Sequence, residues 1–75
     1  MNNIKRKKIK QSIILLNQAE NIINDVLLEE EGSFDNLSEG LQQTLRGEQM
    51  EENIETLEET LELINESLEL LSNIE

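Results

Sequence analysis

With 75 residues, the chain can form one domain at most, and a chain this short buries only a modest share of its surface when it folds. It contains no cysteine and no histidine, which excludes disulfides and the usual zinc sites as sources of stability, and we expect no metal or other cofactor. The formal net charge of −11 repels nucleic acid and anionic lipid, so direct binding to either is disfavoured.

The first predicted helix starts with a basic run, residues 5–10, which holds every positive charge of the chain except Arg46. Apolar residues recur at helical spacing in one wide stripe, formed by Ile9, Ile13, Leu16, Ala19 or Glu20, Ile23 and Leu27. We predict a helix over about residues 3–31, with Asn2 or Asn3 as its N-cap. Two ends are compatible with the sequence, a stop at Gly32 and a continuation through Phe34.

The connection, residues 32–47, combines three glycines with several Asp, Asn and Ser residues, a composition typical of turns. Leu37, Leu41 and Leu45 recur inside it at four-residue steps. We therefore expect a short helical turn that packs over one end of the molecule, with Phe34 filling the space beneath it. Thr44 is the expected N-cap of the next helix.

The second predicted helix covers about residues 45–74 and carries the strongest pattern in the sequence. Its apolar residues alternate in steps of four and three, the heptad repeat of a coiled-coil seam. They are Met50, Ile54, Leu57, Leu61, Ile64, Leu68 and Leu71. With no proline and one aromatic residue in the chain, helix is favoured over strand throughout. We predict one all-α domain in which the two helices form an antiparallel, coiled-coil-like hairpin.

Some apolar residues lie outside both seams, where a single partner helix cannot cover them. They are Leu15, Ile22, Leu63, Leu70 and Ile74. Two stacked hairpins would bury them, so we predict a homodimer or a higher homo-oligomer, built as a four-helix or larger bundle.

Glutamates of the second helix form one long acidic face, with no Lys or Arg after Arg46 to neutralise it. They are Glu51, Glu52, Glu55, Glu58, Glu59, Glu62, Glu66 and Glu69. The simpler interpretation is a solvated face, which is ordinary on bundle helices. However, like charges four residues apart cost a few tenths of a kcal/mol per pair, and their spacing of about 5–6 Å is close to the phosphate repeat of a nucleic-acid strand. The face is therefore a candidate mimic of nucleic acid.

The basic run has three interpretations. It can complement the acidic end of the second helix, where Glu66, Glu69 and Glu75 stand, and this is the one we favour. It can also gather in an oligomer, so that Arg6, Lys7 and Arg46 of adjacent chains bind a phosphorylated ligand. A nucleic-acid tail is disfavoured because the run has no aromatic residue for stacking.

No pattern in the sequence indicates catalysis. Paired carboxylates such as Glu58 and Glu59 lie on an exposed face beside no predicted pocket, and the serines have no histidine to activate them. We expect no catalytic residue and no enzyme activity. The first apolar run, residues 13–16, is too short for a signal peptide or a membrane span, so a cytoplasmic protein is expected.

The segments 29–42, 46–48 and 54–74, behind a basic start, resemble the short acidic helical-hairpin proteins that are common in bacteriophages and prophages. In this chain Ser38 stands where the group would have proline after Asn36 and Leu37. The resemblance implies a phage context and the cytoplasm of a bacterial host, without a settled activity. By analogy with small acidic phage proteins, it also implies inhibition of host defence.

Three functions follow as hypotheses. The first is an anti-defence inhibitor whose acidic face occupies the basic nucleic-acid-binding groove of a host protein, such as a nuclease. The second is an oligomeric sponge that sequesters a nucleotide immune signal. The third is a structural helical bundle with no inhibitory role.

Overall fold

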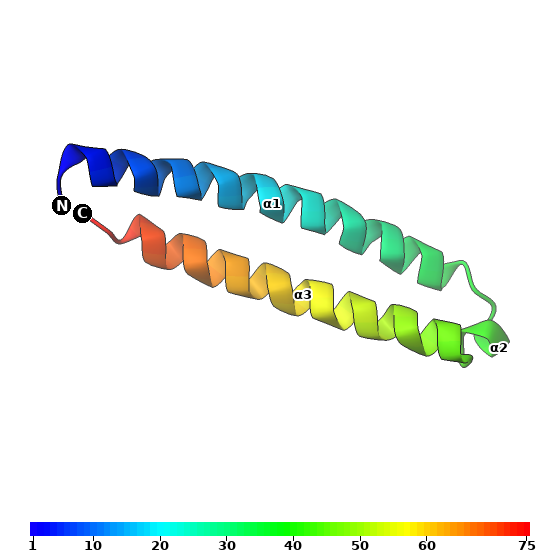
Figure 1. Cartoon of the computed structure of the whole chain (residues 1–75). Helices are drawn as coiled ribbons and strands as arrows, with labels where there is room; N and C mark the ends of the chain where they lie inside the picture. Colours follow the sequence, from blue (N-terminus) through cyan, green and yellow to red (C-terminus); the bar gives the residue numbers. More distant parts are fainter.

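The computed structural model describes all 75 residues and contains three helices and no strand, which confirms the all-α prediction. They are α1 (Asn3–Asp35), α2 (Glu39–Gln42) and α3 (Leu45–Ser72). Figure 1 shows α1 and α3 side by side and running in opposite directions. We call the end with both termini the open end, and the end with α2 the closed end. None of the three helices has a stretch long enough and apolar enough to cross a membrane.

Helix α1 is capped at its start as expected, but it does not stop at Gly32. The Asn2 side chain accepts a hydrogen bond from the backbone N–H of Lys5, at 2.9 Å. Gly32 has a negative φ and so lacks the left-handed conformation that ends many helices. The helix continues to Asp35, and the N–H of Asn36 closes its last turn on the Gly32 carbonyl, at 3.1 Å. This continuation brings Phe34 into line with the apolar stripe.

Two caps and one amide hold the closed end together. Ser38 caps α2, and Thr44 caps α3 by accepting from the N–H of Gly47, at 3.4 Å. The side-chain amide of Gln42 donates to the carbonyl oxygens of Phe34 and Leu37, at 3.1 and 3.2 Å. Because these carbonyls belong to the end of α1 and the turn after it, Gln42 ties α2 to α1. The expected short helical turn is therefore α2, but two of the leucines that predicted it, Leu41 and Leu45, are exposed and do not pack over the end of the molecule.

The contact between α1 and α3 is a single narrow seam. Its residues on α1 are spaced by alternating steps of four and three: Ile9, Ile13, Leu16, Glu20, Ile23, Leu27, Glu30 and Phe34. Most of them are half-buried, and Leu27, at 7% exposed, is the one buried apolar side chain. The α3 seam residues from Met50 to Leu71 are half-buried as well. The rod measures 58 × 15 × 13 Å and has a radius of gyration of 17.2 Å, whereas a compact domain of this length would have about 11 Å.

Glu20 interrupts the apolar seam of α1. Both Ala19 and Glu20 are half-buried, but only Glu20 keeps the spacing of the other seam residues. One of its carboxylate oxygens, Oε2, is buried without a hydrogen-bond partner. A buried polar atom without a partner loses its hydration without compensation, so this side chain weakens the seam.

We therefore predict that Glu20→Leu stabilises the protein. The substitution removes the unpartnered oxygen and completes the apolar seam, and it should raise the free energy of unfolding by about 1 kcal/mol or more. Urea unfolding followed by circular dichroism measures this change. Glu20→Gln, which keeps the polar character and the size, is the matched control and should recover only part of the gain.

Two of the three glycines should respond to alanine in opposite directions. A Cβ at Gly47 would lie 2.5 Å from the carbonyl carbon of Gln42, so Gly47→Ala must push α2 away from α3 and should cost about 1–3 kcal/mol. Gly32 lies within α1, and a Cβ there would meet no atom within 4 Å, so Gly32→Ala should add about 0.5–1 kcal/mol through helix propensity. Thermal unfolding of the two variants tests both signs, and equal shifts would contradict the close approach at Gly47.

Candidate functional site: an acidic face

The heptad positions decide which residues of α1 and α3 share a face. With Gly47, Ile54, Leu61 and Leu68 at position a of α3, Glu51 and Glu58 fall at e and Glu55 and Glu62 at b. In α1, with Leu27 and Phe34 at a, Glu31 falls at e and Asp35 at b. In an antiparallel pair, the e and b positions of the two helices flank the seam on one side, and the g and c positions flank it on the other.

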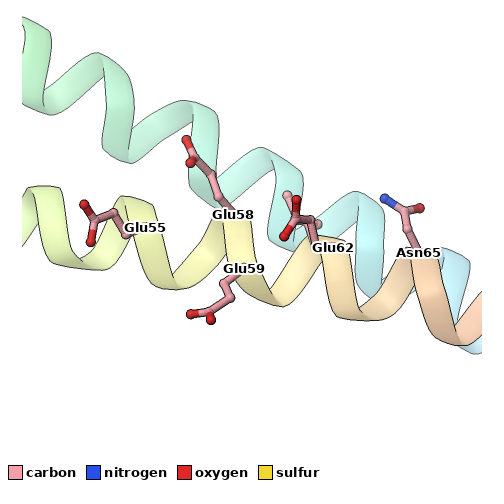
Figure 2. A pocket seen from close by; sticks show the side chains of 6 residues that line it. Glu55, Glu58, Glu59, Glu62 and Asn65 are labelled. Atoms are coloured by element: carbon pink, nitrogen blue, oxygen red, sulfur yellow. The ribbon is translucent and has the colours of Figure 1, made fainter.

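Four of the predicted glutamates surround one shallow depression on α3. Its lining consists of Glu55, Glu58, Glu59, Leu61, Glu62 and Asn65. Figure 2 shows Glu58 and Asn65 directed to the side on which α1 lies, whereas Glu59 points the other way. All four carboxylates are exposed to solvent. The middle of α3 therefore presents a dense group of charges that a partner can reach.

Two carboxylates of α1 join this group. A second depression is lined by Glu31, Phe34 and Asp35 of α1 together with Glu51, Ile54, Glu55 and Glu58 of α3. Glu55 and Glu58 line both depressions, so the two are continuous. We define the acidic face as the carboxylates of these two depressions. Glu31 and Asp35 were missed from the sequence, although their e and b positions in the α1 heptad would have indicated them.

Toward the middle of the rod, amides replace carboxylates. A third depression on the same side is lined by Glu20, Asn21 and Asn24 of α1 and by Leu61 and Asn65 of α3. Asn65 also lines the first depression, so the acidic face ends in this amide-rich region. The acidic face thus extends from near the closed end to the middle of the rod.

The structure does not gather all the predicted glutamates into one surface. Glu66 and Glu69 line a separate depression with Leu70 and Asn73. Glu52 is exposed on α3 and lines neither this depression nor the acidic face. The predicted face of α3 therefore divides into the central group, which extends onto α1, and a smaller group nearer the C-terminus.

The basic residues lie at the two ends of the rod. Arg6 and Lys10 share a groove at the open end with Glu75 and with apolar residues that include Ile13 and Leu71. Glu66 and Glu69, the other two residues expected to face the basic run, do not line this groove, so the pairing stays a prediction. Arg46 lies at the start of α3, at the closed end, so one chain does not bring Arg6 and Arg46 together. Lys7 is exposed on α1.

The apolar residues predicted outside the seams are all exposed. Leu15 and Ile22 on α1 are in this group, and so are the residues on and after α3, Leu63, Leu70 and Ile74. No group of three or more acidic side chains is arranged to hold a metal ion. Comparisons with protein families, with curated proteins and with solved structures find no match to this chain.

Proposed function

We propose that this protein is a small helical inhibitor that binds, through its acidic face, the basic nucleic-acid-binding groove of a host protein. The observation that carries the proposal is the lining of the two continuous depressions, where carboxylates of α1 and α3 meet and no lysine or arginine is present. Such a surface attracts basic grooves over long range and speeds their association, especially at low salt.

The energetics favour a role for this charge over simple solvation. Like charges at adjacent helical turns destabilise the helix that carries them, and the acidic face adds carboxylates of a second helix to that repulsion. A basic partner would relieve it. Toward the middle of the rod, the acidic face ends at the amides of Asn24 and Asn65.

The biological context of the proposal comes from the resemblance of the sequence to short acidic phage and prophage proteins. In this context the partner is a bacterial defence protein, such as a nuclease, and the inhibitor acts in the host cytoplasm without catalysis. We also propose that the antiparallel α1–α3 pair persists in solution as a hairpin, and that hairpins associate with one another into a bundle.

A nucleotide sponge is the second candidate. The groove at the open end supports it, because Arg6 and Lys10 stand there beside apolar residues that could contact a base. Arg46 would have to come from an adjacent chain. Calorimetry against a panel of cyclic and modified nucleotides separates the candidates, since binding at micromolar ligand favours the sponge. A structural bundle would respond in neither assay.

Charge reversal on the acidic face tests the leading proposal. The wild-type chain, immobilised, should capture from bacterial lysate a protein that excess duplex DNA releases, and the free chain should block binding of that protein to a DNA oligonucleotide. The triple variant Glu55→Lys, Glu59→Lys and Glu62→Lys should lose both effects, by about a hundredfold or more in affinity, because each reversal replaces attraction with repulsion. Mobility-shift titrations give the affinities.

A second triple variant controls for net charge. Asp25→Lys, Glu39→Lys and Glu75→Lys change the formal charge equally, but none of these residues lines the acidic face. This variant should inhibit almost as well as wild type. If the two triple variants behave alike, or if DNA does not release the captured protein, the mimicry proposal is wrong.

A further inference from the structure

The side of the rod opposite the acidic face is uncharged over most of its length. On α1, the g and c positions carry Ser12, Leu15, Ala19, Ile22 and Val26. On α3 and just after it, the same positions carry Thr56, Thr60, Leu63, Ser67, Leu70 and Ile74. We call this set the uncharged face. It contains the apolar residues predicted outside the seams, and it is independent of the acidic face on which the proposed function rests.

The uncharged face leaves large apolar side chains in water. Ile22 is 65% exposed and Leu70 is 69% exposed. The accessible surface of the chain is 5998 Å², whereas a compact domain of 8.7 kDa would have about 4,700 Å². A side 58 Å long and 15 Å wide is of the size that a standard interface takes from each partner, about 800 Å². The surplus area is thus enough for one stable contact.

We propose that a second copy of this chain covers the uncharged face in one defined direction, with the open end of each copy over the closed end of the other. A twofold axis then crosses the rod at the level of Ala19, the midpoint of α1. Helix α1 lies antiparallel to the partner's α1, and α3 lies antiparallel to the partner's α3. The two acidic faces point outward on opposite sides of the dimer.

The side chains of α1 fit this direction. With the axis at Ala19, this residue, which has the smallest side chain of the uncharged face, faces Ala19 of the second copy. The two α1 helices must approach each other most closely at this point. The axis sets Leu15 of each copy near the partner's Ile22, and Ser12 near the partner's Val26. Apolar contacts therefore surround the axis on both sides.

The side chains of α3 fit the same axis. Glu20 of α1 lies beside Leu61 and Asn65 of α3, so the axis crosses α3 close to residue 65. About this level, Leu63 faces the partner's Ser67, Leu70 faces the partner's Thr60, and Ile74 faces the partner's Thr56. Each large apolar side chain meets a smaller one, which is how facing layers interdigitate without voids.

Charge selects this direction over its reverse. On α1 the face is bounded by Lys8 at the open end and by Glu29 toward the closed end, and both occupy position c. With open end over closed end, each Lys8 meets the partner's Glu29, because the two lie almost equally far from Ala19. With open end over open end, the Lys5 and Lys8 side chains of both copies would share one end and repel each other.

A single cysteine at the axis tests the direction. The natural chain has no cysteine, so Ala19→Cys introduces the only thiol, and it should cross-link into a disulfide-bonded dimer under mild oxidation because the axis brings it to its own copy. Asn21→Cys, two residues away on the other side of α1, is the matched control and should stay monomeric on a non-reducing gel. If Ala19→Cys cross-links no better than Asn21→Cys, the proposed direction is wrong.

Two isoleucines of α1 test the face. Ile22 and Ile14 are 65% and 58% exposed, but Ile14 falls at position b, on the side of the acidic face. Ile22→Asp should raise the dimer dissociation constant by about a hundredfold or more, and Ile14→Asp should leave it within about threefold, as measured by sedimentation equilibrium. Circular dichroism verifies that both variants stay helical. A monomeric wild-type chain at tens of micromolar, or equal effects of the two variants, would overturn the proposal.

Exchanging the boundary charges gives a test that leaves the apolar contacts intact. Lys8→Glu and Glu29→Lys should each raise the dissociation constant by about tenfold, since each occurs twice in the dimer, and the double variant should restore it. No restoration in the double variant would contradict the open-over-closed direction. The charge-reversed acidic-face triple should still dimerise, so the failure of one proposal is distinguishable from the failure of the other.

Discussion

The structure depends on one interaction, the apolar seam between α1 and α3. Two helices that touch along a single line can enclose very little, and here the seam buries one apolar side chain, Leu27, while its other members remain half-exposed. A pair of helices in this arrangement gains much less from burial than a compact domain of equal length. The elongated shape of the molecule and its large exposed surface follow from this limited burial.

The narrow seam leaves two long sides that differ in chemistry. The e and b positions collect carboxylates of both helices, whereas the g and c positions of the second half carry no charged residue from Gln49 to Ile74. This segregation is not required by the seam itself, since either side would tolerate glutamate. The side without charge has the composition of an interface, and the side with charge has the composition of a surface that must stay in water until a basic partner covers it.

The parts of the fold that repeat were predictable from the sequence. The heptad of α3 located its bounds to within a few residues, and the N-caps at Asn2 and Thr44 followed from local chemistry. The closed end was harder, because the Gln42 amide bonds and the close approach at Gly47 are tertiary contacts that no local pattern encodes. For the end of α1 the sequence left two alternatives, a stop at Gly32 and a continuation through Phe34, and the structure shows the continuation because Gly32 lacks the positive φ of a helix-ending glycine.

The sequence predicted the part of the acidic face that lies on α3 but not the part that lies on α1. The glutamates were predicted to share one side of α3. The predicted heptad repeat covered that helix alone, so the carboxylates of α1 were not included. Extending the repeat through α1 requires Glu20 rather than Ala19 in the stripe, and Glu30 after Leu27, as seam residues. Once they are accepted, Glu31 and Asp35 join Glu51 and Glu55, and the uncharged face emerges opposite them. The two polar seam residues, Glu20 and Glu30, thus fix the heptad register of α1, and this register determines which residues of α1 lie on the acidic face and which lie on the uncharged face.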